Sequence, residues 1–230
     1  MLLHNFLLLN YEVNKLGANM PRFRRLKVVK AGFLQAISSL WDRLIIRRAL
    51  LLAGEPKFVL DSPCGDGQLW PILAEKAYRR IYAADDSSEK LVSAWNKNSS
   101  KVVERVRIFH SSACTIDLPG ESVDCILSMQ PFHSYCGRPT NSRRLLEFHR
   151  ITRDSLILAV EVERKPGFFS QIRGFDRSKG NADASKSISF SQIEDGFLLA
   201  GFTIQRFIVR LPPFDMRRTY ILRKCEADIK

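Results

Sequence analysis

The sequence has few of the residues that build metal centres, disulfide frameworks or membrane spans. No CxxC pair occurs among its five cysteines, and no histidine lies near them at the spacing of a metal site. The apolar opening MLLHNFLLLNY lacks a basic leader and a small-residue cleavage site, and it is far shorter than the ~20 residues of a bilayer span. We therefore expect a cytoplasmic protein in a reducing compartment, without a metal.

Acidic residues are also scarce. The chain has 24 Asp and Glu residues against 36 Lys and Arg residues, which gives a formal net charge of +12. This excess would attract a polyanion such as RNA or an anionic membrane surface, and it does not distinguish between them. With 230 residues, of which 45% are hydrophobic, the chain can bury one substantial core. We therefore expect one basic domain.

The first quarter of the chain differs in pattern from the remainder. Apolar residues recur at helical spacing over residues 31–53, and Gly54 and Pro56 close this segment. From Lys57 onward, short β-branched runs alternate with amphipathic segments. We therefore assign residues 1–56 to an N-terminal helical extension and residues 57–230 to the main domain.

The main domain follows the pattern of an α/β protein. The predicted strands are FVLD (58–61), IYAA (81–84), VRIFH (106–110), VDCILSM (123–129), SLILAVEV (155–162), FTIQRFIV (202–209) and RTYILR (218–223). Helices are predicted near residues 69–78, 89–95, 145–151 and 190–200, and a short LPPFD turn joins the last two strands. This order predicts a Rossmann-like, doubly wound, seven-stranded sheet that is mostly parallel, with an antiparallel last strand. The basic residues 163–187 would form a lid or surface loop.

The segment VLDSPCGDG carries the clearest chemical signal, because a strand runs into a glycine turn and then into a helix. Gly65 and Gly67 would let the backbone approach a ligand at the carboxyl end of the first strand, and N–H groups at the helix start could receive a carboxylate or phosphate. Trp70 occupies the third glycine position of GxGxxG, which disfavours a dinucleotide. No GxxxxGK(S/T) cradle for a triphosphate is present either.

Two adjacent carboxylates end the second predicted strand. Asp85 lies 18 positions beyond Gly67, which suits a side chain that accepts both ribose hydroxyls of an adenosine. Asp86 competes for this role. The pair could instead cap the next helix together with Ser87 and Ser88, and the two interpretations are compatible.

In order and spacing, these motifs resemble those of the class I S-adenosylmethionine-dependent methyltransferases. VLDSPCGDG resembles the glycine-rich first motif of that family, IYAADDS the second, and VRIFHSSA followed by DLP the third. ESVDCILSM and SLILAVEV resemble its fourth and fifth strands, and LLAGFTIQRFIV and RTYILRK its sixth and its antiparallel seventh. The resemblance implies that the cofactor is S-adenosyl-L-methionine.

The resemblance also implies which residues bind this cofactor. Asp61 would hold the amino group, directly or through water, and Asp85 would take the ribose. Ser112 stands where many relatives have an acidic residue near the adenine amino group, so its hydroxyl would supply that contact. The full predicted set is Asp61, Pro63, Gly65, Gly67, Asp85, Asp86, Ser112, Ala113 and Ser128.

Transfer of a methyl group from a sulfonium is an in-line displacement, so the enzyme mainly aligns donor and acceptor. His133 and Tyr135 follow the fourth strand in MQPFHSY, and His133 is the preferred base for a hydroxyl acceptor. His133 could equally be an ordinary polar loop residue. QPF partly resembles the Asn/Asp-Pro-Pro-aromatic motif of amine methylation, but Gln130 and a missing proline depart from it, and no amine specificity follows.

Two basic regions suit an anionic acceptor. The first covers residues 22–30, and the second covers residues 163–187, where Phe168 and Phe169 accompany the cations. They suit anionic lipid or phosphate backbones equally, or they form only a solvated face. The loops resemble those of bacterial cell-envelope and lipopolysaccharide-core methyltransferases, so we expect O-methylation of a small molecule or a phosphorylated glycan or glycolipid at the inner membrane face. An RNA methyltransferase and a non-catalytic S-adenosylmethionine-binding module are the alternatives.

Overall fold

The computed structural model describes residues 40–132, 139–161, 190–209 and 217–225. The predicted catalytic pair His133 and Tyr135, the basic residues 22–30, the predicted lid at 163–187 and the LPPFD turn lie outside the described residues. The described residues from Ile45 onward belong to one compact unit, and the division between residues 1–56 and 57–230 stays a prediction.

Seven strands form one sheet, as the sequence predicts. Their spatial order is β3-β2-β1-β4-β5-β7-β6, and β7 pairs antiparallel with both of its neighbours while the other pairs are parallel. The strands are β1 (Phe58–Asp61), β2 (Arg80–Asp85), β3 (Val106–His110), β4 (Val123–Phe132), β5 (Thr152–Glu161), β6 (Phe202–Val209) and β7 (Arg217–Lys224). This arrangement confirms the Rossmann-like, mostly parallel sheet with an antiparallel last strand.

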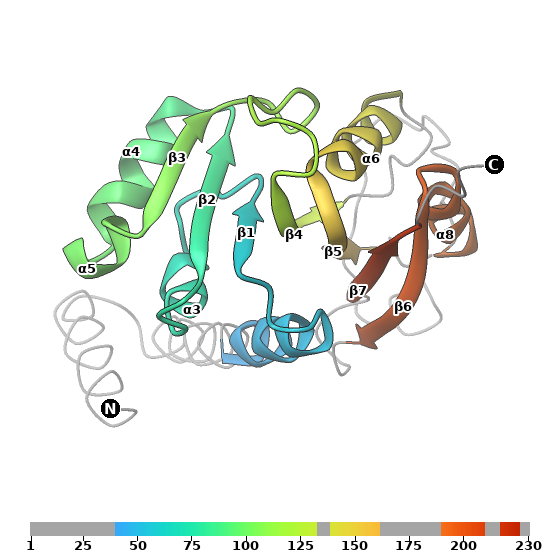
Figure 1. Cartoon of the computed structure of the whole chain (residues 1–230), viewed down its shortest axis with the longest axis horizontal. Coiled ribbons are helices and arrows are strands. Elements are labelled where there is room, and N and C mark those ends of the chain that lie inside the picture. The colour runs from blue at the N-terminus through green and yellow to red at the C-terminus, as the bar shows by residue number, and fades with distance from the viewer. Residues whose placement is uncertain (1–39, 133–138, 162–189, 210–216, 226–230) are drawn as a thin grey trace, which may run out of the picture. The chain divides into compact units, whose positions relative to one another are not determined.

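Helices cover both faces of the sheet. The bounds are α3 (Trp70–Leu73), α4 (Ser88–Lys97), α5 (Ser100–Val103), α6 (Pro139–Ile151) and α8 (Phe190–Leu199), and residues 40–52 are also helical. In Figure 1, α4 and α5 lie beside β3, and α8 lies beside β6 at the other end of the sheet. No helix among the described residues is long and apolar enough to cross a membrane.

Side-chain alternation divides the core into two layers. Val59 of β1 packs in one layer with Ile46 and Leu50 of the first described helix, and Leu60 packs in the other with Phe148 of α6 and Phe197 of α8. All six side chains are almost fully buried. Because successive residues of a strand point to opposite faces, one strand thus serves both layers, each such side chain contributing about 1.5–3 kcal/mol.

The helix predicted over residues 69–78 is much shorter in the structure, where α3 ends at Leu73. The reason lies in a distant arginine. The Arg105 guanidinium donates hydrogen bonds to the carbonyl oxygens of Ala74, Lys76, Ala77 and Arg79. Those carbonyls are therefore satisfied outside a helix, and the chain can turn into β2 instead.

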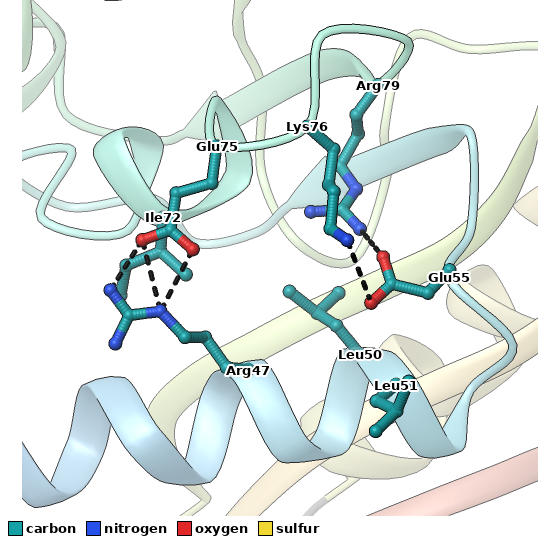
Figure 2. A pocket seen from close by; sticks show the side chains of 8 residues that line it. All are labelled: Arg47, Leu50, Leu51, Glu55, Ile72, Glu75, Lys76 and Arg79. Atoms are coloured by element: carbon teal, nitrogen blue, oxygen red, sulfur yellow. Dashed lines mark hydrogen bonds and ion pairs between the residues drawn. The ribbon is translucent and has the colours of Figure 1, made fainter.

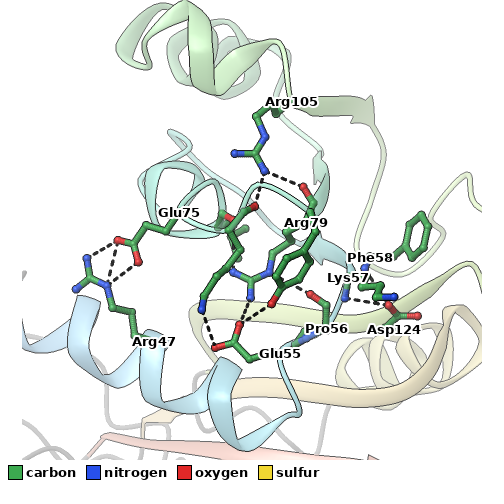
Figure 3. A network of polar contacts seen from close by, with 12 residues as sticks. Arg47, Glu55, Pro56, Lys57, Phe58, Glu75, Arg79, Arg105 and Asp124 are labelled. Atoms are coloured by element: carbon green, nitrogen blue, oxygen red, sulfur yellow. Dashed lines mark hydrogen bonds and ion pairs between the residues drawn. The ribbon is translucent and has the colours of Figure 1, made fainter.

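A pocket of about 310 Å³ lies near the amino ends of β1 and β2, and Figure 2 shows its lining. Its charged side chains pair with one another: Arg47 with Glu75, and both Lys76 and Arg79 with Glu55. Figure 3 shows that the Arg79 guanidinium, 3% exposed, also donates to the Pro56 carbonyl oxygen. These contacts fix the segment that leads into β1. It lies at the amino ends of the parallel strands, opposite to their carboxyl ends.

Candidate functional site

The chain order of the sheet reverses between β1 and β4. From β1 the chain moves to β2 and β3 on one side, and from β4 it moves to β5 on the other. In open α/β sheets, ligands bind outside the carboxyl ends of the strands at such a switch point. Here Asp61 of β1 is paired with Leu127 of β4, and β4 is irregular between Ser128 and Phe132. The predicted cofactor residues cluster at this edge.

Asp61 ends β1 and is only 1% exposed. Within the part of the chain that the structure describes, neither of its carboxyl oxygens makes a hydrogen bond. Burial raises the pKa of Asp61 well above its usual range, and the nearby Asp85 carboxylate raises it further, while the Trp70 indole partly lowers it. The indole nitrogen does not reach hydrogen-bond geometry with any acceptor. Asp61 is therefore a buried acidic group without a bonded partner of its own.

Asp85 ends β2 and is equally buried, but it is well bonded. Its Oδ2 accepts the Gly65 N–H at 2.9 Å, and its Oδ1 accepts the Ser87 N–H at 3.0 Å. The Lys90 ammonium lies 3.8 Å from Oδ1. Ser87 itself caps α4, since its Oγ accepts the Lys90 N–H. Asp85 therefore joins the glycine turn to the start of α4, as the capping interpretation predicts.

The glycine turn has two left-handed residues, Gly65 with φ +52° and Gly67 with φ +67°. A Cβ at Gly67 would lie 2.9 Å from Ala94 of α4 and from Asn98, which caps that helix, so this glycine is required by packing. A Cβ at Gly65 would lie 3.1 Å from Gln130 Nε2. The N–H groups of both glycines donate within the chain, to Asp85 and to the Cys64 carbonyl oxygen. A ligand carboxylate would therefore need donors other than these two groups.

The predicted adenine contacts lie after β2 and β3. Asp86 is exposed, and its carbonyl oxygen is 3.0 Å from His110 Nε2. The Ser112 hydroxyl accepts the Cys114 N–H at 3.2 Å and so stabilises a tight turn that includes Ala113. These residues lie near the β2 carboxyl end, because His110 pairs with Asp85. Pro63 is half-buried beside the glycine turn, after a cis peptide bond.

Two side chains that sequence reasoning did not select also lie at this edge. Gln130 of β4 approaches Gly65, as described above. Arg144 of α6 donates to the buried Ser128 Oγ at 2.5 Å, and its guanidinium lies over the Phe148 ring. Burial lowers the pKa of Arg144 to about 10, against the opposing influence of Cys114 and Asp86. The sequence signal for Arg144 was its position: a charged residue one helical turn before Phe148, on an otherwise apolar face.

Comparisons with known proteins agree with this geometry. Residues 60–160 match the model of a family described as a methyltransferase domain. An S-adenosylmethionine-dependent methyltransferase from Clostridium acetobutylicum superposes with a TM-score of 0.62 at 14% identity, covering 90% of this chain and 100% of its own. Magnesium protoporphyrin IX methyltransferase from Synechocystis PCC 6803, with bound S-adenosylhomocysteine, gives 0.55 at 17% identity, covering 94% of each chain. No curated protein matches.

The fold, with its switch point between β1 and β4, is that of the class I methyltransferases. The match over residues 60–160 supports a methyl-transferring enzyme, and the fold is one that S-adenosylmethionine-dependent methyltransferases share. Within the described residues, no group of His, Cys, Asp and Glu could hold a metal ion.

Proposed function

We propose that S-adenosylmethionine binds across the carboxyl ends of β1, β2 and β3, with its charged amino group beside Asp61. The single observation that carries this proposal is the buried Asp61 carboxyl group, which has no hydrogen bond to any of the described residues. A buried acid of this kind needs a cationic or donor partner, and the amino group of the cofactor is one. The cofactor supplies a methyl group bound to a sulfonium.

The remaining predicted residues fit the other parts of the cofactor. Asp85 stands at the end of β2 for the ribose, and the exposed Asp86 and Ser112, with the half-buried Ala113, would contact the adenine. The glycine turn, with Pro63, Gly65 and Gly67, borders the amino-acid end together with Ser128 of β4. Each of these residues positions the donor and excludes water, and none exchanges a covalent bond with it.

For the acceptor, we propose an anionic small molecule or a phosphorylated glycan or glycolipid that is methylated on oxygen. His133 would remove the hydroxyl proton, with Tyr135 beside it. The net charge of +12 supports an anionic acceptor, and so does the Arg144 guanidinium at the carboxyl end of β4. Peripheral contact with the inner membrane face would bring the enzyme to a lipid-linked acceptor.

The cofactor site is tested by calorimetric titration with S-adenosylhomocysteine. We expect Asp85→Asn to weaken binding by more than tenfold, ~1.4 kcal/mol, because a carboxylate is replaced by an amide that accepts less strongly. Asp66→Asn is the matched control. Asp66 lies between Gly65 and Gly67, but its side chain pairs with Lys97 at the surface, so its loss should leave binding unchanged. Equal effects of the two substitutions would contradict the assignment of Asp85.

The acceptor is tested by incubating the enzyme with radiolabelled S-adenosylmethionine and separated lipid, glycan, small-molecule and RNA fractions of a cell extract. We expect label in an anionic glycan or glycolipid, and its loss in His133→Ala. Label in RNA, with affinity that falls steeply with salt, would establish the RNA methyltransferase instead. Cofactor binding without label in any fraction would favour a non-catalytic binding module.

A further inference from the structure

The carboxyl groups of Asp61 and Asp85 lie on the same face of the sheet. Asp61 is in register with Ala83, and Asp85 is two residues further along the neighbouring strand, so both side chains point to the layer that holds α3 and α4. Adjacent strands are about 4.8 Å apart and two residues advance by roughly 6.6 Å. Two acids are therefore buried within one small region.

The groups that face this pair do not supply Asp61 with a positive charge. From the turn comes the Cys64 thiol, whose pKa is raised by burial and by both acids. From α3 comes the neutral Trp70 indole, and from β4 the neutral Gln130 amide lies against Gly65. The Lys90 ammonium of α4 is near Asp85 at 3.8 Å and is about half exposed.

The two acids are therefore unequal. Asp85 accepts two backbone N–H groups and has the Lys90 ammonium nearby. Asp61 accepts no hydrogen bond and is repelled by Asp85. When two buried carboxyl groups interact, a proton is retained on the one whose charge is less stabilised.

We propose that Asp61 holds a proton in the cofactor-free protein and releases it to solvent when the positively charged amino group of the cofactor binds beside it. The inference rests on the proposed function. In this exchange the O–H bond of Asp61 breaks and the proton passes to the buffer. The ammonium keeps its three protons and donates to the new carboxylate. The bound state is the same as if Asp61 had been a carboxylate before binding. The only difference is that one proton is released to solvent during binding.

This exchange links cofactor affinity to pH. Below the pKa of Asp61, each bound molecule that carries the amino group should release one proton. Its affinity should therefore rise by up to tenfold for each unit of pH, ~1.4 kcal/mol. A ligand that lacks the amino acid portion leaves Asp61 protonated, so its affinity should not change with pH in this way.

The test is calorimetry of the full chain with S-adenosylhomocysteine and with 5′-methylthioadenosine, which has the nucleoside but no amino acid. Titrations in two buffers of different ionisation heat at each pH, acetate and MES at about pH 5.5 and phosphate and Tris at about pH 7.5, give the number of protons released. We expect close to one proton for S-adenosylhomocysteine at the acidic end and none for methylthioadenosine. Asp61→Asn should bind S-adenosylhomocysteine without proton release.

Each outcome decides a separate question. Binding of S-adenosylhomocysteine with no proton release at any pH would overturn this inference and leave the proposed function standing. Equal proton release by both ligands would also overturn it, since the amino group would then not be the cause. If neither ligand binds, the proposed function fails, and this inference fails with it. If Asp61→Asn does not fold, the comparison of the two ligands on the unaltered chain still decides.

Discussion

At the scale of single residues, the buried Asp61 carboxyl group has a stability effect that does not require a ligand. Its folded pKa lies above its unfolded value of about 3.9, so the folded state binds more protons than the unfolded state between the two values. Asp61 destabilises the folded state least below its unfolded pKa, where the carboxyl group is protonated in both states. This destabilisation grows as pH rises towards the folded pKa. The steepest slope is about 1.4 kcal/mol per pH unit.

We therefore predict that Asp61→Asn becomes progressively more stable relative to the unaltered protein as pH rises. The amide cannot ionise, so it escapes the growing cost of burying a charge. Urea unfolding of both proteins at about pH 5 and about pH 8 measures the difference in the free energy of unfolding. A difference that stays constant or shrinks with pH would show that Asp61 is not held in its protonated form.

The two glycines of the turn should differ in what they contribute. Gly67→Ala brings a methyl group against Ala94 and Asn98 at 2.9 Å, and we expect a loss of roughly 2–4 kcal/mol in the free energy of unfolding. Gly65→Ala meets only the movable end of Gln130, so its loss should be about 1–2 kcal/mol. Thermal or urea unfolding of the two variants tests this order, and a larger loss for Gly65→Ala would contradict it.

At the scale of elements, α8 offers a matched pair of glycines. Gly201, which follows the helix with φ +83°, would place a Cβ 2.7 Å from the His149 ring, so we expect Gly201→Ala to cost roughly 2–4 kcal/mol. Gly196 lies within the helix and faces open space. Gly196→Ala should stabilise the protein by about 0.5–1 kcal/mol. The midpoint of thermal unfolding should therefore move in opposite directions for the two variants.

The elements also show what the sequence could predict. Seven strands and their order along the chain follow from runs such as VRIFH and VDCILSM, because short β-branched runs and turn residues are local signals. The short length of α3 is not a local property, since Arg105, about thirty residues later, binds the carbonyls that would have continued the helix. The contact between Arg144 and Ser128 is equally non-local.

The same limit applies to the site. Asp61, Gly65 and Asp85 were selected because the strand-turn-helix motif places them at strand ends, and the structure brings Gly65 and Asp85 into direct contact. That the Gly65 and Gly67 N–H groups are already bonded, and that Gly67 packs on α4, could not be read from the motif, because α4 begins about twenty residues further along the chain.

At the scale of the whole molecule, cofactor binding should stabilise the fold. A ligand present at 100 times its Kd, and bound only by the folded state, raises the free energy of unfolding by ~2.7 kcal/mol. For a chain of this size, the expected rise in Tm is roughly 5–10 °C. A thermal shift measured with S-adenosylhomocysteine tests this, with adenosine monophosphate as a control nucleotide that lacks the amino acid. An equal shift with both would indicate nonspecific nucleotide binding.

The position of β7 affects how the enzyme is made. β7 lies between β5 and β6, although residues 217–224 follow both of those strands in the chain. During synthesis on a ribosome, β6 is therefore complete before β7 and has no strand to pair with. The edge of β5 that pairs with β7 in the folded protein is also unpaired at that stage. A chain that lacks residues 217–224 would retain the glycine turn, Asp61 and Asp85, yet it would expose two strand edges to proteases and to aggregation. We therefore expect chains truncated before β7 to be degraded or to aggregate, although they carry the residues of the proposed cofactor site.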